Sequence, residues 1–214
     1  MKRRPKVVLL HGLARTHRSM DGLRRHLEAA GYSTWARSYP SRHLPIVDLA
    51  TLLAQQIRDE LPEEPLLAVT HSLGGIIVRH MAALLPWRRV VMVAPPNRGS
   101  RVAQLFRDQP LFRWFYGPAG QEVADPDGWP APPEPFAVIA GTRAFSPTNP
   151  TSWVTHPFKL LAEAGPSDGT VTVEETRLPG MADFATIDAS HTLILRHPQV
   201  RAWIVQFLER GRFR

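Results

Sequence analysis

Short runs of consecutive apolar residues alternate along this chain with longer segments whose apolar residues recur every three or four positions. Such runs are typical of strands buried on both faces of a parallel sheet, and the longer segments are typical of helices. We interpret six runs as strands: Lys6–Leu10, Tyr32–Arg37, Leu66–Val69, Arg89–Ala94, Phe136–Ala140 and Phe184–Ile187. The alternation predicts an α/β fold with a mostly parallel central sheet of about six strands and helices on both faces.

Four helices are expected between or after these strands. One covers Met20–Leu27 and ends near Gly31, and another has Pro45 at its first position. A third covers residues 73–85, and the last begins at Pro198. Because ligands bind beyond the carboxyl ends of the strands in parallel sheets, the loops that follow the strands are the places to look for chemistry.

Two segments, residues 100–135 and 142–167, interrupt this alternation. The first contains an expected helix, the aromatic run LFRWFYG and the proline-rich stretch DPDGWPAPPEP. Long loops in a compact domain are often functional, so both segments are candidates for a lid or cap. The alternative is that the aromatic residues of 105–116 simply pack on the core. The chain has no internal repeat, and we expect one domain over residues 1–214.

Composition narrows the class of protein. Of the 214 residues, 43% are hydrophobic, which is enough for a substantial core, and none is cysteine. A disulfide framework, a thiolate metal site and a cysteine nucleophile are therefore excluded. The opening MKRRPKVVLLHG has too short an apolar run for a signal peptide, and no stretch approaches the length of a membrane span. We expect a soluble, cytoplasmic protein.

The formal net charge is +7, and nearly all of the positive charge is arginine spread along the chain. There is no basic run with interleaved aromatic residues, so we expect no nucleic-acid partner and interpret the arginines as a solvated surface. Weak association with an anionic membrane surface stays open. The sequence does not indicate an oligomeric state.

The stretch LLAVTHSLGGII is the strongest motif. Ser72 follows a buried apolar run and precedes a helical segment, which is the context of a nucleophile elbow. Such a turn needs small neighbours, and Gly74 and Gly75 meet that need on one side. Thr70 stands on the other side, where glycine is usual. The alternative is a glycine-rich turn that only starts a helix.

A serine hydroxyl becomes a good nucleophile only beside a base. The base should lie on the loop after the last strand, and His191 in IDASHTLILRHP is in that place. His197 is better placed to cap the final helix. His71 directly precedes the serine, and we expect it to point to the other side of the elbow.

The group that orients the base is expected after the Phe136–Ala140 strand, because the chain order serine, acid, histidine belongs to this architecture. Asp168 in GPSDGTVTV fits this order, and Gly169 allows a sharp turn there. An ordinary Asp-Gly turn is the alternative. Asp188 is too close to His191 in sequence, and Asp183 starts a strand.

Two backbone N–H groups are candidates for an oxyanion hole. One belongs to Leu73, directly after the serine, and the other to Leu13, in the loop after the first strand. Gly12 leaves the backbone of that loop uncovered. The residues expected to support the elbow and pocket are His11, Gly12, His71 and Gly74.

Together these pieces resemble the α/β-hydrolase superfamily, and more narrowly compact bacterial serine esterases and lipases related to lipase class 2 and to GPI-inositol deacylases. The resemblance is carried by VVLLHGLART, VTHSLGG, APPNRGS, PSDGTVTVEET and ASHTLILRHP, which span nearly the whole chain. The chain departs from the family pattern at Thr70. It also lacks the two extra N-terminal strands of larger relatives, so we expect a minimal α/β-hydrolase fold.

The resemblance implies a serine hydrolase that cleaves carboxylic esters, small or lipid, through an acyl-enzyme on Ser72. Asp168 would be the acid and His191 the base, with Asn97 and Ser100 at the rim of the pocket. No cofactor is implied, although a structural calcium ion stays open because its ligands need not be close in sequence. An acyltransferase, thioesterase or amidase would use the same residues. A hydrolase-fold protein that only binds a partner is the alternative from another class.

Overall fold

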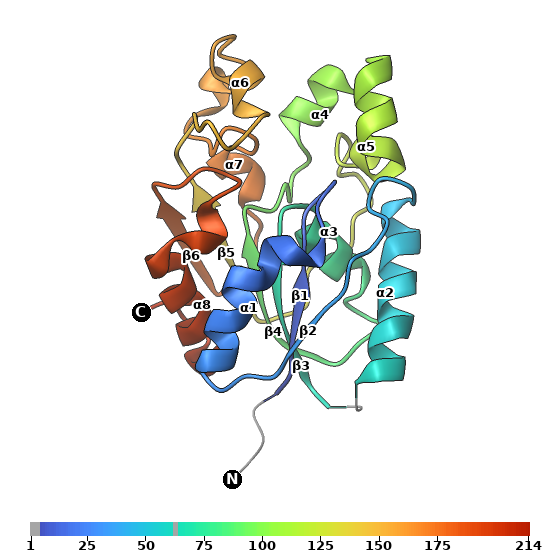
Figure 1. Ribbon diagram of the computed structural model, residues 1–214, viewed down its shortest axis with the longest axis vertical. Helices are drawn as coiled ribbons and strands as arrows, with labels where there is room; N and C mark the ends of the chain where they lie inside the picture. Colours follow the sequence, from blue (N-terminus) through green and yellow to red (C-terminus); the bar gives the residue numbers. More distant parts are fainter. Residues whose placement is uncertain (1–4, 62–63) are drawn as a thin grey trace.

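A parallel sheet of six strands forms the centre of the molecule (Figure 1). The computed structural model describes residues 5–61 and 64–214, so the basic residues Lys2 and Arg3 of the opening lie outside the described residues. The strands are β1 (Val7–Leu10), β2 (Thr34–Ala36), β3 (Leu66–His71), β4 (Trp87–Val93), β5 (Phe136–Gly141) and β6 (Asp183–Ile187). Their order is β2-β1-β3-β4-β5-β6, and every pairing within the described residues is parallel. The predicted α/β fold with about six strands is confirmed.

Helices cover both faces of this sheet. The longer ones are α1 (Asp21–Ala29), α2 (Ile46–Glu60), α3 (Leu73–His80), α4 (Arg101–Phe106), α5 (Pro110–Glu122) and α8 (Pro198–Arg210). The shorter ones are α6 (Ser152–Thr155), α7 (Val173–Thr176) and the 3-10 turns η1 (His17–Met20), η2 (Ala162–Ala164) and η3 (Ile194–Arg196). None of the helices in the described ranges is long and apolar enough to cross a bilayer.

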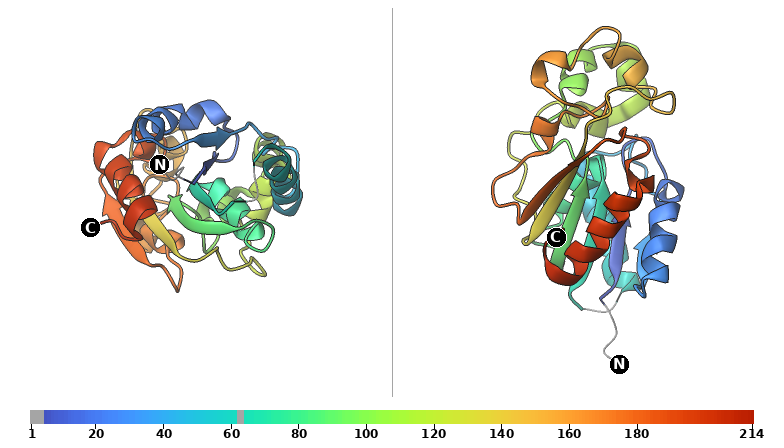
Figure 2. Two further views of the ribbon diagram at one scale, coloured as in Figure 1. Left: turned by 90° about the horizontal axis from the view of Figure 1, so that it is seen from below. Right: turned by 90° about the vertical axis from the view of Figure 1, so that its left-hand side faces the viewer.

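The two faces of the sheet belong to two separate cores, which is why β1 is apolar and buried at every position. Val8 and Leu10 of β1 pack with residues of α2 and α3, whereas Val7 and Leu9 pack with residues of α1 and α8. Figures 1 and 2 show α1 and α8 together on one side of the sheet and α2 on the other. Successive strand residues point to opposite faces, so burial on both sides requires an unbroken apolar run.

Two predicted helix boundaries are wrong. Pro45 lies just before α2 as its capping residue, with an extended ψ of 158°, and is not the first helical residue. The helix predicted over residues 73–85 ends at His80, and turns follow it. Pro86 lies close behind these turns, and proline disfavours a helical conformation of the residue before it.

Helices α4, α5 and α6, which belong to the segments that interrupt the alternation, lie beyond the carboxyl ends of the strands, at the top of Figure 1. Residues 100–135 contain two helices, α4 and α5, rather than the one expected. The part that contains these two helices, residues 100–123, begins and ends at a hydrogen bond of 2.7 Å from the Ser100 N–H to the Val123 carbonyl. A carboxylate oxygen of Glu122 accepts from the Ile46 N–H at 2.7 Å, which ties α5 to the start of α2.

Candidate active site

Ser72 occupies a sharp turn between β3 and α3. Its backbone has φ 52° and ψ −123°, a conformation that a non-glycine residue adopts only under constraint from its surroundings. The Ser72 N–H donates to the Val93 carbonyl at 2.9 Å, and the Gly75 N–H donates to the Ser72 carbonyl at 2.8 Å. Within the described residues the Ser72 hydroxyl makes no hydrogen bond to the protein.

Glycines let the chain pass close to this turn. A Cβ atom at Gly74 would lie 2.6 Å from the Leu10 carbonyl oxygen, so α3 can approach β1 only because this residue has no side chain. A Cβ atom at Gly12 would lie 3.2 Å from both the Ser72 Cβ and the His71 ring. The loop after β1 therefore passes directly beside the serine.

Asp168 and His191 form a buried pair. The His191 Nδ1 lies 2.7 Å from the Asp168 Oδ2, and the two side chains are 10% and 1% exposed. The His191 N–H also donates to the Asp168 carbonyl at 3.0 Å. Asp168 thus fixes both the ring and the backbone of the histidine. Asp188 instead pairs with Arg143 at the surface, at 2.8 Å, and Asp183 accepts backbone N–H groups of Phe184 and Phe213.

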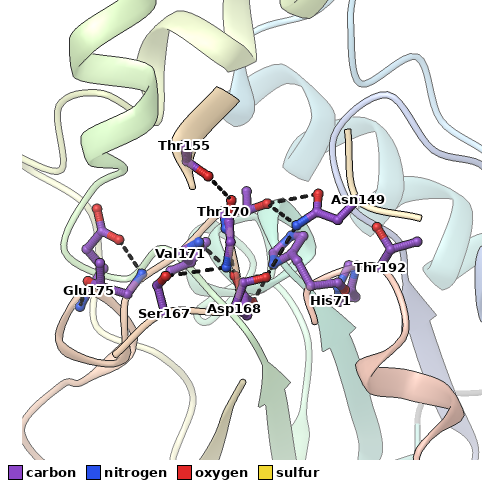
Figure 3. Close-up of polar contacts among 12 residues, drawn as sticks. His71, Asn149, Thr155, Ser167, Asp168, Thr170, Val171, Glu175 and Thr192 are labelled. Carbon is purple, nitrogen blue, oxygen red and sulfur yellow. Dashed lines mark hydrogen bonds and ion pairs between the residues drawn. The ribbon is translucent and has the colours of Figure 1, made fainter. Parts of the chain in front are cut away.

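The loop that carries Asp168 is held by hydrogen bonds on both sides (Figure 3). The Asp168 Oδ1 accepts from the Thr170 N–H at 3.0 Å and from the Val171 N–H at 2.8 Å. The Oδ2 atom is left for the histidine. The Asn149 side chain donates to the Asp168 carbonyl at 3.3 Å, and the Thr155 hydroxyl donates to the Gly169 carbonyl at 2.8 Å. The segment predicted to be irregular, residues 142–167, therefore supports the acid.

His71 does not point to the other side of the elbow as predicted. Its ring lines the same pocket as Ser72 and lies 4.8 Å from the His191 ring, centroid to centroid. Strand β3 continues to His71, two residues beyond the predicted end, and this extension directs the ring toward the pocket. Its Nε2 lies 3.0 Å from the His191 carbonyl oxygen. Burial, followed by the charge of His191, holds the pKa of His71 well below its usual range, so a neutral ring donates to that carbonyl.

His11 has a supporting place beneath the loop after β1. Its ring is fully buried and stacks on Tyr39 at 3.7 Å between centroids, and the Tyr39 hydroxyl donates to the His11 carbonyl. Burial lowers the pKa of His11 to about 4, which keeps the ring neutral. Its Nδ1 lies 2.9 Å from the Gly12 carbonyl and holds the loop backbone beside Ser72.

The two backbone groups predicted for an oxyanion hole lie at the pocket. Leu13 and Leu73 both line it, on either side of the serine turn. Neither N–H donates to another residue in the part of the chain that the structure describes. Leu73 is also the first residue of α3, where unpaired N–H groups carry a partial positive charge.

These groups surround a cavity of about 280 Å³. One wall is mostly apolar and comes from α4, α5 and their ends: Val102, Ala103, Phe112, Phe115, Tyr116 and Val123. The opposite wall comes from the loops that support the acid: Asn149, Pro150, Thr151, Thr170 and Val171. The cavity is therefore apolar on one side and partly polar on the other, with Ser72 and His191 between.

The aromatic run contributes to the core and to the cavity wall, and its role as a lid stays a prediction. Phe112 packs against the core and also lines the cavity, whereas Leu111 and Trp114 are exposed to solvent. Alternating exposure of this kind follows from the turn of a helix that covers the cavity with one face only.

Sequence reasoning missed several residues of the site. Asn149 and Thr170 line the cavity and bond to one another at 3.1 Å, and Arg15 reaches its edge. Asn and Thr in irregular segments are too common to single out from a sequence. Ser100 lines the cavity as predicted, but Asn97 does not. Asn97 is buried and donates to the Thr176 carbonyl at 2.8 Å.

Comparison with known proteins identifies the family to which this chain belongs. The family model for the alpha/beta hydrolase fold matches residues 5–128, more than half of the chain. The chain belongs to the α/β-hydrolase family. No curated protein sequence matches this chain at a significant level. Within the described residues, no group of three or more His, Asp or Glu side chains is placed to hold a metal ion.

Solved structures similar to this chain include several lipolytic proteins. The mature form of lipase BlEst2 from Bacillus licheniformis superposes with a TM-score of 0.75 at 20% identity, covering 91% of this chain and 88% of that one. The metagenomic carboxyl esterase MGS0156 superposes with a TM-score of 0.68 at 20% identity, covering 89% and 65%. Phospholipase PlaB from Legionella pneumophila gives 0.65 at 20% identity, covering 96% and 59%. At these identities the likeness concerns the fold.

Proposed function

We propose that this protein is a serine hydrolase that cleaves carboxylic esters through an acyl-enzyme on Ser72. The observation that carries the proposal is a constrained serine turn that lines the same cavity as a buried His191–Asp168 pair. A serine with φ 52° has a strained backbone. Such strain is concentrated at functional sites, and a nucleophile elbow is a site of this kind.

The first half of the reaction follows from which ring nitrogen is free. Because the His191 Nδ1 is bonded to Asp168, its Nε2 is the atom that can take the Ser72 proton. As that proton leaves, Oγ attacks the ester carbonyl carbon and its oxygen becomes an oxyanion. The N–H groups of Leu13 and Leu73 stabilise this negative charge. The imidazolium then gives its proton to the departing alcohol as the C–O bond breaks.

The second half releases the acid. Water enters the place left by the alcohol, and the His191 Nε2 takes a proton from it as its oxygen attacks the acyl carbon. The bond to Ser72 breaks, and the proton returns to Oγ. Asp168 stays ionised throughout and stabilises the transient imidazolium.

The cavity walls suggest how the ester lies. The apolar wall formed by Phe112, Phe115 and Tyr116 suits the acyl chain, and the wall with Asn149 and Thr170 suits the more polar alcohol part. A cavity of about 280 Å³ accommodates a chain of moderate length without the protein opening further. We therefore expect turnover to rise from acetyl to medium-chain esters.

Hydrolysis of p-nitrophenyl esters from short to long acyl chains tests the proposal. Ser72→Ala is expected to lower kcat by about 10⁴-fold or more, and Asp168→Asn by about 10⁴-fold, because each removes a member of one unit. A fluorophosphonate probe is expected to label the parent protein and not Ser72→Ala.

Ser190→Ala is the matched control, since the Ser190 hydroxyl is buried beside His191 and has no partner in the described structure. Its turnover is expected to stay within about twofold of the parent. Equal turnover by Ser72→Ala and the parent would exclude Ser72 as the nucleophile. Unchanged turnover in Asp168→Asn would remove the acid from the mechanism.

A further inference from the structure

Exposed large apolar side chains are concentrated at one end of the molecule. Among the described residues eleven are exposed, and eight of them come from two short segments, residues 105–115 and 145–158. These eight, which we call the mouth patch, are Leu105, Leu111, Trp114, Phe115, Phe145, Trp153, Val154 and Phe158. The other three, Val47, Leu52 and Leu84, lie elsewhere in the sequence. A concentration of this kind marks a surface that contacts something apolar.

The mouth patch has two flanks, one on each side of the cavity entrance. Phe115 of α5 belongs to the patch and also lines the cavity. On the other flank, Pro150 and Thr151 line the cavity and lead directly into α6, which carries Trp153 and Val154. Figures 1 and 2 show α4, α5 and α6 together at the same end, beyond the strands. A partner that covers both flanks therefore faces the entrance.

Several apolar side chains of the patch have most of their surface in solvent. Leu111, Trp114 and Phe158 are 74%, 73% and 72% exposed. Trp114 is held outward by Arg42, whose guanidinium lies 5.8 Å from its ring and donates to the Phe115 carbonyl. The α5 flank of the patch is thus tied to the rest of the molecule through Arg42.

Charge at the patch has one dominant sign. Within residues 105–115 and 145–159 the charged side chains are Arg107, Arg113, Lys159 and a single acid, Asp108. Asp108 lies 4.0 Å from Arg107, and all four side chains are exposed. Arg113 and Lys159 stand beside the most exposed apolar residues and make no ion pair in the described structure. An anionic apolar surface complements this arrangement.

We propose that the mouth patch docks this protein onto an anionic lipid bilayer, with both flanks inserted at the headgroup level and the cavity entrance facing the membrane. The tryptophan and phenylalanine side chains of the patch enter the membrane–water interface, and the arginine and lysine side chains beside them contact the anionic headgroups. A protein partner seated on both flanks would cover the entrance, whereas a bilayer can deliver a substrate through it. Delivery of a substrate from the bilayer rests on the proposed function, but the docking itself does not.

Vesicle binding tests the proposal without hydrolysis. The full chain carrying Ser72→Ala is mixed with vesicles of phosphatidylcholine alone or with one third phosphatidylglycerol, and bound protein is measured by co-sedimentation. Binding is expected only to the anionic vesicles, with a blue shift of tryptophan emission, and it should weaken in high salt. Because Ser72 is absent, failure to bind vesicles and failure to hydrolyse esters are separate results.

Two variants localise the contact. Trp114→Ser with Phe158→Ser removes one highly exposed aromatic side chain from each flank and is expected to weaken binding at least tenfold. Leu84→Ser with Val47→Ser removes exposed apolar residues away from the patch and is the matched control, expected to bind as the parent does. Arg113→Gln with Lys159→Gln should reduce binding to anionic vesicles and leave the far-ultraviolet circular dichroism unchanged.

Three outcomes would overturn the proposal. They are no binding to the anionic vesicles, equal binding by the patch variant and the control variant, and self-association that is lost in the patch variant in the absence of lipid. The last result would assign the mouth patch to contact between copies of the protein.

Discussion

Two buried histidines near the cavity act by staying neutral. His11 holds the loop after β1, and His71 holds the backbone of His191. Burial lowers the pKa of His11 to about 4 and holds the pKa of His71 well below its usual range. A proton on either ring would convert a hydrogen-bonded support into an unpaired buried charge. The residues that position the serine are therefore themselves sensitive to acid.

The sign of this effect on stability follows from proton binding. In the unfolded chain a histidine titrates near pH 6.5, whereas folded His11 titrates near pH 4, so below pH 6.5 the unfolded state binds more protons. The stabilising contribution is fully present above pH 6.5 and is lost as the pH falls toward 4. We expect the free energy of unfolding to drop by about 3 kcal/mol from His11 alone across that range.

Urea denaturation at a series of pH values measures this drop. His11→Gln is expected to flatten the dependence between pH 6.5 and 4, while His43→Gln, which changes an exposed histidine, should leave it unchanged. An equally steep dependence in His11→Gln would contradict the assignment.

Single residues also mark the limit of what the sequence could predict. Ser72, Asp168 and His191 could be selected because each follows a different strand in a required order, and order survives in a sequence. The direction of the His71 ring could not be predicted in this way. It depends on β3 continuing two residues further than expected, and on a hydrogen bond to the carbonyl of His191, 120 positions away in the sequence. Asn149 and Thr170 carry no local signal at all.

At the scale of elements, the close approach of α3 to β1 decides where the serine turn lies. A Cβ atom at Gly74 would lie 2.6 Å from the Leu10 carbonyl and 2.9 Å from the Leu10 Cβ, and neither atom can move without displacing β1. Strands and helices could be predicted from periodicity, but this distance between them could not. Periodicity describes which face is buried and leaves the depth of packing unspecified.

Gly74→Ala is therefore expected to lower the free energy of unfolding by about 1–3 kcal/mol and to reduce ester turnover, because the added methyl group overpacks the contact. The matched control is Gly22→Ala in α1. There a Cβ would meet only the end of the flexible Arg201 side chain, at 2.8 Å. That change should be neutral or stabilising by up to about 1 kcal/mol, because alanine favours a helix.

Denaturation curves of the two variants, measured side by side, check this difference. Equal stability of Gly74→Ala and Gly22→Ala would show that β1 and α3 can separate freely.

Across the whole molecule, arginine joins parts of the chain that are far apart in sequence. Several arginines donate to backbone carbonyls of distant elements: Arg42 to Phe115, Arg58 to Leu84, Arg79 to Pro130 and Asn97, and Arg89 to Leu208. The expectation that the arginines form a solvated surface is wrong for Arg79, which is buried. Composition could not reveal it, because a carbonyl partner leaves no charged residue in the sequence to pair with.

Arg79 shows the effect most clearly. It is 6% exposed and donates to the carbonyls of Pro130, Asn97 and Trp129 at 2.6, 2.8 and 3.3 Å. Burial lowers its pKa to about 10, yet it stays charged at neutral pH. It joins α3 to the proline-rich stretch.

Arg79→Met is expected to lower the free energy of unfolding by about 3 kcal/mol, because three carbonyls lose their donor, among them that of the buried Asn97. Arg88→Met, which changes an exposed arginine, is the matched control and should stay within about 0.5 kcal/mol of the parent. Thermal and chemical denaturation measure both, and a stable Arg79→Met protein would show that other donors can replace the guanidinium.

The hydrogen bond from the Ser100 N–H to the Val123 carbonyl closes the excursion that contains α4 and α5. Ser100 and Val123 lie side by side, so the residues between them form a module with adjacent ends. Insertions and exchanges at such a junction leave the surrounding backbone in place. The sheet, the serine turn and the acid loop can therefore be inherited unchanged while this module is replaced. Natural or laboratory evolution could then alter chain-length preference and docking together, by recombination at a single site.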